Sequence, residues 1–326
     1  MAVDPRQKIG SVVIVATLAA LVIAAISPLL GGSGMDYGRL WRGESPDWEI
    51  FINLRVPRTL LAFLAGAALS VAGALYQAVL REALATPSSL GVTSAAALGA
   101  VAAIALGNGE ETGFPLVWAA ALAGSAVVIA LVAALGRVQR FTAFTLLLTG
   151  IALSGICTAL ILLLHSLAGI TRSFQIAHWL MGGIDAVEYS VLGWLAGAIG
   201  LGTWWSIRQA RVLNVLMLGE AWATGRGVDC RRITWQAFAV GAMLVGTVTA
   251  VTGPIGFVGL IVPHLLRRML GPDYRLLIPA CWLGGGAFLV VCDAISRSVM
   301  APVEIPVGVT TALLGGPFFV WLLWNR

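Results

Sequence analysis

Two arginines stand directly before a long apolar run, in the stretch LRVPRTLLAF at residues 54–63. The planar guanidinium of Arg55 or Arg58 can bind a carboxylate through two parallel hydrogen bonds. Pro57 lies between them, and a proline at a helix start fixes the backbone without removing a needed donor. The pattern predicts two cations held at one end of an apolar helix, where they can recognise carboxylates.

A second pair of charged residues lies near the end of another apolar stretch. Asp293 and Arg297 are four residues apart, so they share one face of a helix. A carboxylate inside a membrane span is costly and is usually paired. We therefore expect an Asp293–Arg297 ion pair that orients the arginine. One paired acid near a helix end makes no proton relay, which argues against ion-coupled transport.

Other residue types that could do chemistry lack the spacing for it. The four cysteines and three histidines show no zinc-ligand pattern, and we predict no metal site. The spans contain no Ser/His, paired-Asp or His/Glu arrangement, which argues against an intramembrane enzyme. Lys8 is the only lysine, so the chain has no Gly-Lys-Ser/Thr phosphate-binding motif. We expect no cofactor on this chain, and any ATPase that drives it is another polypeptide.

Apolar helices must position these residues. Hydrophobic residues make up 59% of the 326 positions and charged residues 11%, whereas soluble domains carry about 25% charged residues. The composition predicts an all-α polytopic membrane protein. Runs of about 20 apolar residues predict ten spans, at about 9–30, 57–80, 90–107, 115–136, 142–168, 189–207, 233–252, 256–270, 276–296 and 306–324. A short amphipathic piece at about 173–183 lies between the fifth and the sixth.

Basic residues in the loops orient the spans. With the amino terminus inside, the outside holds six of the 20 basic residues, namely Arg39, Arg42, Arg55, Arg58, Arg172 and Arg297. Cytoplasmic loops are the ones enriched in Lys and Arg. The excess on the inside predicts both termini in the cytoplasm and puts Arg55 and Arg58 on the outer face.

A short internal echo suggests a repeat. AFLAGAAL at 62–69 and AFAVGAML at 237–244 share the pattern Ala-Phe-x-x-Gly-Ala-x-Leu, in spans expected to run in opposite directions. Inverted repeats are common in transporters. The echo predicts two halves, about 55–185 and 230–324, although five identities in Ala/Gly-rich helices can also arise by chance.

Five stretches together resemble the permease family of type II ATP-binding cassette importers, which take up ferric siderophores, haem and cobalamin. They are LRVPRTLLAFLAGAALSVAGALYQAVLREALATPSSLGVTSAAALGA (54–100), WLMGG (179–183), LNVLMLGEAWATGRGV (213–228), GPIGFVGLIVPHLLRRMLGPDYRLLIPA (253–280) and EIPVGVTTALLGGPFFVWLL (304–323). The resemblance implies one transmembrane permease domain over residues 1–326, in a bacterial cytoplasmic (inner) membrane.

The resemblance also implies partners. It predicts a homodimeric pore formed with a second copy of the chain, inside a lipid bilayer and with no nucleic acid. Two cytoplasmic ATPase subunits would bind ATP and magnesium. A soluble binding protein would deliver the substrate from outside.

The resemblance assigns roles to particular residues. Arg55, Arg58 and Arg297 are expected to receive acidic side chains of the binding protein, with anchoring at lipid headgroups as the alternative. The cytoplasmic segment at about 211–229 is expected to be the coupling loop that docks on the ATPase. The family positions that carry over to it are Leu218, Gly219, Glu220, Ala223 and Gly227. Arg226 departs from the family, which usually has an apolar residue there.

Two further assignments follow from the resemblance. Leu84 and Ala85 are expected near a cytoplasmic gate, although Glu82-Ala83 replaces the usual Asn-Pro before them. Small polar residues of the fifth and tenth spans are expected to line the pathway, with interhelical hydrogen bonding as the alternative for each. They are Thr145, Thr149, Ser154, Thr158, Thr310 and Thr311.

The function expected from these features is permeation without covalent chemistry. The chain would move a metal chelate that the binding protein delivers. A ferric siderophore is the first choice, with haem and cobalamin as alternatives. An ion-coupled secondary transporter is the alternative of another class, but it needs titratable groups in mid-span, and Asp293 near a span end is the only carboxylate in a span.

Overall fold

Helices make up almost all of the described chain. The computed structural model describes residues 20, 22–29, 36–83, 85–107, 114–138 and 143–324. Its elements are η1 (Ser27–Leu29), α2 (Tyr37–Arg42), α3 (Asp47–Ile50), η2 (Phe51–Arg55), α4 (Val56–Leu80), η3 (Pro87–Leu90), α5 (Val92–Leu106), α6 (Phe114–Val138), α7 (Ala143–Leu167), α8 (Ile170–Leu180), α9 (Tyr189–Met217), α10 (Glu220–Gly225), α11 (Cys230–Thr252), α12 (Val258–Leu270), α13 (Tyr274–Ser298) and α14 (Val307–Trp324). These ranges contain no strand, so the prediction of an all-α protein is confirmed.

Nine of the ten predicted spans coincide with a helix, and the span at 9–30 lies mostly outside the described residues. Six helices of the described part are long and apolar enough to cross a membrane: Asp47–Leu80, Pro115–Val132, Phe144–Leu167, Tyr189–Met217, Cys230–Thr252 and Tyr274–Ser298. α5 and α14 are apolar but shorter, and α12 has 13 residues. The count of ten spans therefore stays a prediction.

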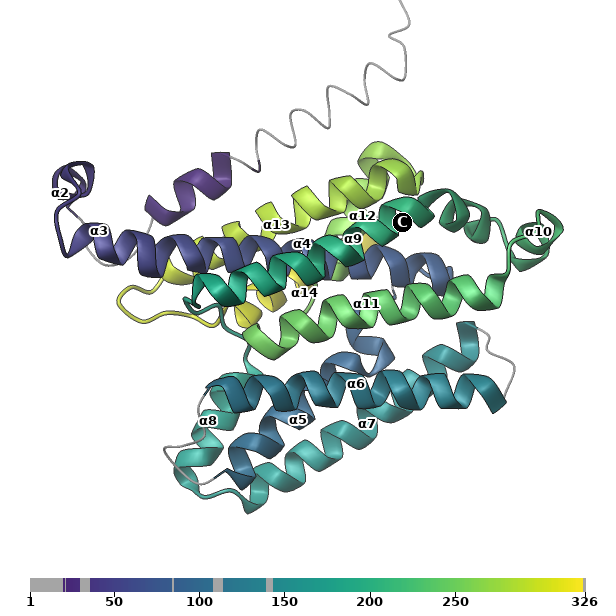
Figure 1. The fold of residues 1–326 in the computed structure, drawn as a ribbon, viewed down its shortest axis with the longest axis horizontal. Helices are drawn as coiled ribbons and strands as arrows, with labels where there is room; N and C mark the ends of the chain where they lie inside the picture. The colour runs from purple at the N-terminus through teal and green to yellow at the C-terminus, as the bar shows by residue number, and fades with distance from the viewer. Residues whose placement is uncertain are drawn as a thin grey trace, which may run out of the picture.

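α4 lies at the centre of the packing. Its apolar window is 83% buried, and α4 packs against α13, α11, α12 and α9. Where α4 crosses α13, a Cβ atom added to Gly66 would overlap the carbonyl group of Gly285. Small residues allow helix backbones to approach this closely in membrane proteins. Figure 1 shows α5, α6, α7 and α8 as a second layer, joined to the first beneath α11.

The packing partners follow the order that an inverted repeat requires. We match α4, α5 and α6 with α11, α12 and α13. α4 then packs on α13 as α11 packs on α6, and α4 packs on α12 as α11 packs on α5. The glycines of the two echoed stretches, Gly66 and Gly241, both lie at close helix contacts, the second against the ring of Tyr76. The packing supports the repeat that the short echo predicted.

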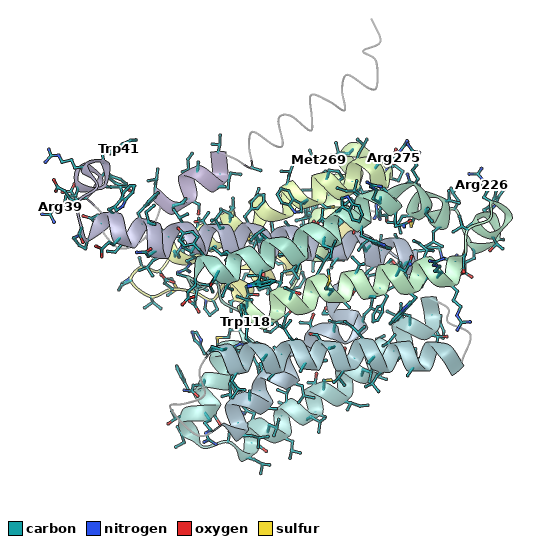
Figure 2. The ribbon with its side chains drawn as sticks, in the orientation of Figure 1. Arg39, Trp41, Trp118, Arg226, Met269 and Arg275 are labelled. Carbon is teal, nitrogen blue, oxygen red and sulfur yellow. The ribbon has the colours of Figure 1, made fainter. Side chains whose placement is uncertain are left out.

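The bundle has two distinct ends. The α3 end carries Arg58 and Asp293, and the α10 end carries Arg81 and Glu220. In Figure 1, α2 and α3 lie at one extreme of the long axis and α10 at the other. Figure 2 shows Arg39 at the α3 end and Arg226 at the α10 end.

The glycine crossing of α4 and α13 gives a test of this fold. Gly66→Ala should destabilise the protein by about 1–3 kcal/mol, because the new methyl group meets backbone that cannot move aside. Thermal unfolding in detergent measures the loss. Gly155→Ala on α7 is the matched control, since a Cβ there meets no atom within 4 Å. Equal unfolding temperatures for the two variants would contradict the close α4–α13 contact.

Candidate functional site

An ionic cluster joins four segments at the α3 end. Arg58 lies at the start of α4, and its Nη2 is 3.0 Å from Asp293 Oδ1 on α13. Arg58 Nε donates a second hydrogen bond to the same oxygen, at 3.1 Å. Arg58 Nη1 is 2.7 Å from Glu304 Oε2, in the segment that precedes α14. Arg58 therefore bridges two carboxylates that lie far away in the sequence.

Arg297 completes the cluster from the other side of Asp293. Arg297 Nε is 3.0 Å from Asp293 Oδ2, so the ion pair expected from the spacing is present. Arg297 Nη2 also donates to the hydroxyl of Ser27 in η1, at 3.1 Å. The Asp293 carboxylate thus lies between two guanidinium groups, and the first described segment of the chain covers one of them.

The burial of these charges decides how they act. The Asp293 side chain is 0% exposed, the Arg297 side chain 5% and the Arg58 side chain 17%, whereas the Glu304 side chain is 54% exposed. Two cations and one anion are therefore withdrawn from water, and Glu304 balances the charge from the surface. A buried charge is tolerated only when it is well paired. The buried charges therefore fix these segments relative to one another, and Glu304 is the exposed carboxylate of the cluster.

The three arginines expected to form a docking set differ in exposure, and their docking role stays a prediction. Arg55 is only 7% exposed, and its Nη1 donates to the carbonyl oxygen of Pro28 in η1 at 3.1 Å. Arg297 is buried beside Ser27. The cause is tertiary, because η1 folds over both side chains. Of the three, Arg58 has the greatest access to the surface.

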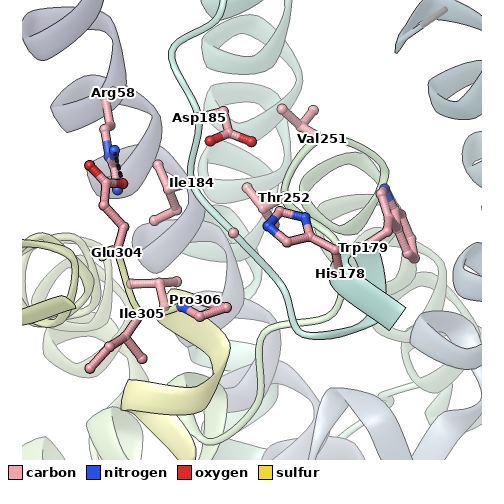
Figure 3. A pocket seen from close by; sticks show the side chains of 12 residues that line it. Arg58, His178, Trp179, Ile184, Asp185, Val251, Thr252, Glu304, Ile305 and Pro306 are labelled. Carbon is pink, nitrogen blue, oxygen red and sulfur yellow. Dashed lines mark hydrogen bonds and ion pairs between the residues drawn. The ribbon is translucent and has the colours of Figure 1, made fainter. Parts of the chain in front are cut away.

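A cavity of about 180 Å³ opens beside the cluster. Arg58 and Glu304 line one side, and His178 and Asp185 line the opposite side (Figure 3). Thr252, at the end of α11, also contributes to the wall. In the described residues, no group of three His, Cys, Asp or Glu side chains could hold a metal ion. The cavity is a mixed-charge recess at the end of the bundle.

Three stretches that sequence analysis quoted separately meet at this cavity. The amide of Gly183, in the WLMGG stretch, donates to the carbonyl oxygen of Thr252 at 2.9 Å. The amide of Gly308, in the EIPVG stretch, donates to the carbonyl oxygen of Gly182 at 3.0 Å. Gly182 has φ +71°, a left-handed conformation that favours glycine. The cavity wall is therefore held by backbone hydrogen bonds between α8, α11 and α14.

At the α10 end, the predicted coupling segment forms a short exposed helix. Gly219 at φ +116° and Gly227 at φ +78° border α10, and both conformations favour glycine. Leu218 is 62% exposed and Trp222 is 65% exposed, while Ala223 is fully buried against the chain. Sequence analysis missed Trp222. Leu218, just before α10, and Trp222, on α10, therefore present two large apolar side chains outward.

Glu220 is the attachment of α10 to the rest of the bundle. Its Oε1 is 2.7 Å from Nη2 of Arg81, the residue that follows α4. Of the two residues expected at a gate, Ala85 is buried, and Leu84 lies outside the described residues.

The small polar residues expected to line a pathway fall into two groups. On α7, Thr145, Thr149 and Ser154 are half-buried and Thr158 is exposed. On α14, Thr310 and Thr311 are buried inside the chain, and their place in a pathway stays a prediction. Thr310 and Ser296 share a hydrogen bond of 2.7 Å between α14 and α13. Thr310 therefore makes an interhelical hydrogen bond, which was the alternative role expected for each of these residues.

Comparison with known proteins identifies relatives along the full length. Residues 13–325 match the family model of the FecCD transport family. The chain is 36% identical to the hemin transport system permease protein HmuU of Yersinia pestis, over 98% of this chain and 96% of that protein. It is 37% identical to the vitamin B12 import system permease protein BtuC of Escherichia coli, over 88% of each.

Two solved structures have a similar fold. A metal-chelate type ABC transporter in an inward-facing conformation superposes with a TM-score of 0.86 at 28% identity, over 98% of this chain and 100% of that one. PsaBC of Streptococcus pneumoniae shares the fold at a TM-score of 0.55 and 16% identity, over 87% of this chain and 94% of that one.

The charge balance of the cluster gives a second test. Asp293→Asn should destabilise the protein by about 3–5 kcal/mol, because it leaves Arg58 and Arg297 without their buried counter-charge. Glu304→Gln, which removes the exposed acid, should cost less than about 1 kcal/mol. Thermal unfolding of both variants in lipid nanodiscs checks the order. A larger loss of stability in Glu304→Gln than in Asp293→Asn would show that the buried Asp293 pairs do not hold the cluster together.

Proposed function

We propose that this chain carries a large metal chelate from a soluble binding protein into the cytoplasm. The chain belongs to the FecCD transport family and is the permease of an ATP-binding cassette importer. The observation that carries the proposal is the full-length relationship to permeases named for haem and vitamin B12. The chain has no phosphate-binding lysine motif, so ATP hydrolysis is assigned to a separate ATPase. A secondary transporter is not favoured.

We assign the α3 end to the outer face and the α10 end to the cytoplasm. The support is the excess of basic residues in the loops that the orientation places inside. Docking of the binding protein would then take place around Arg58 and Glu304, beside the cavity. An acidic side chain of the partner can replace Glu304 on the exposed side of Arg58, because a guanidinium binds carboxylates in a forked geometry.

We assign α10 to the ATPase contact. Leu218, just before α10, and Trp222, on α10, are exposed, and α10 is held by buried Ala223 and by the Arg81–Glu220 pair. Large apolar side chains on a small rigid helix suit insertion into a groove of another protein. A second copy of the chain is placed against α7 and α14, whose exposed residues Leu148, Ile156 and Leu313 are apolar. The mass of the purified complex tests this assembly.

The substrate class is a chelate rather than a free metal ion. The described residues offer no metal-ligand cluster, which suits a cargo that arrives already coordinated. The named relatives concern haem and vitamin B12, so the preference of sequence analysis for a ferric siderophore stays a prediction. Haem, cobalamin and siderophore are therefore separate arms of one experiment.

Uptake into liposomes tests the proposed function. The permease is reconstituted with its ATPase and binding protein, and haemin, cyanocobalamin and a ferric siderophore are offered in turn. We expect ATP-dependent accumulation of at least one chelate and none of free iron or cobalt. Accumulation that follows an ion gradient without ATP would overturn the assignment.

A charge reversal tests the docking site. Arg58→Glu should weaken association with the binding protein by at least about ten-fold, since opposed like charges cost several kcal/mol at an interface. Because Arg58 also pairs with Asp293, the decisive control is a binding protein whose docking acid is changed to arginine. Restored association with that partner separates docking from folding, and its absence would rule out direct contact.

A further inference from the structure

Hydrogen bonds at the α10 end connect α9 to the start of α13. Asn214, on the last turn of α9, accepts a hydrogen bond from the Tyr274 amide at 2.8 Å. Its Nδ2 donates to Asp273 Oδ1 at 2.7 Å. Asp273 caps α13, because the same oxygen accepts from the Arg275 amide at 3.0 Å. One side chain of α9 therefore uses both its donor and its acceptor to hold the first turn of α13.

The connection continues into α12 and α4. Arg267 of α12 donates from Nη2 to the Tyr274 hydroxyl at 3.0 Å. The same nitrogen donates to Gln77 Oε1 at 2.9 Å. Gln77 lies on α4, close to the end of that helix, and is fully buried. Asn214, Tyr274, Arg267 and Gln77 thus link four helices in one continuous chain of contacts.

The Arg81–Glu220 ion pair closes this chain into a ring. Arg81 follows the last residue of α4, and Glu220 is the first residue of α10, with the two charged atoms 2.7 Å apart. α10 begins three residues after Met217, the end of α9. The ring therefore runs from α9 through α13, α12 and α4 to α10 and back to α9. α10 is therefore connected to the bundle through the backbone of α9 and through the side chain of Arg81.

We propose that this ring transmits the displacement of α10 to α4 and α13, and through them to the ionic cluster at the α3 end, with Asn214 as its positioning residue. The inference rests on the proposed function, in which α10 docks on the ATPase. α4 and α13 each have 25 residues, which is about 37 Å of helix. α4 carries Arg58 at its other end, and α13 carries Asp293. The ends of α4 and α13 that lie away from the ring thus meet in the cluster.

The chemistry of the contact makes a sharp variant available. The Arg275 guanidinium and the Asn214 amide hold the pKa of Asp273 at about 2, so this group is a carboxylate at neutral pH. Asn214→Asp would therefore set two carboxylates against each other. Asp273→Asn keeps a side-chain oxygen that can accept from both the Asn214 side chain and the Arg275 amide, and asparagine still caps a helix well.

The test uses the permease assembled with its ATPase in nanodiscs. Spin labels at Phe174→Cys and Val303→Cys report the distance across the α3 end, because both side chains are exposed, at 73% and 63%. Cys230→Ser removes the one native cysteine that is not buried. Distances are measured without nucleotide and after trapping with ATP and vanadate. Asn214→Ala is the main variant, and Gln209→Ala, also on α9, is its control.

We expect the wild type and Gln209→Ala to show the same nucleotide-dependent shift in distance. Asn214→Ala should keep ATPase assembly and basal ATP hydrolysis, yet lose more than half of that shift. Asn214→Asp should lose the shift as well, whereas Asp273→Asn should keep it. A full shift in Asn214→Ala or Asn214→Asp, or loss of the shift in Asp273→Asn, would overturn the inference. So would a wild type without any shift, or an Asn214→Ala variant that no longer assembles. Failure of the wild type to bind an ATPase would instead contradict the proposed function.

Discussion

A carboxylate that is completely removed from water fixes one end of this protein. Asp293 can stay charged inside the bundle only because guanidinium groups approach it from both sides. Each guanidinium belongs to a different segment, and each holds a further partner, Glu304 for Arg58 and Ser27 for Arg297. The position of α4 against α13, the path of the segment before α14 and the seat of η1 all follow from satisfying this one charge.

The rest of the bundle is built so that such pairing can occur at both ends. Glycines let α4 and α13 approach closely where they cross, so the two helices pack as one pair. Polar side chains are concentrated where that pair ends, in the ionic cluster and in the Asn214–Tyr274–Arg267–Gln77 contacts. The membrane-spanning middle of the bundle can therefore remain apolar, because polar contacts fix the helices at its two ends.

Sequence patterns predicted what depends on local spacing. The helices follow from apolar run length, and the Asp293–Arg297 pair follows from a separation of four residues. The Arg58 pairs could not be found in this way, because Asp293 and Glu304 lie 235 and 246 residues from Arg58. For the same reason the burial of Arg55 and Arg297 under η1 was missed. Resemblance to a family assigns a role to a position, but it does not show what covers that position.

The contact between Ser27 and Arg297 spans 270 residues. During synthesis the amino-terminal segment leaves the ribosome first, and the residue it must cover is made close to the end of the chain. Contacts of such high sequence separation form late and slowly. The segment that contains Ser27 can therefore make its native contact with Arg297 only after α13 has been made and inserted into the membrane.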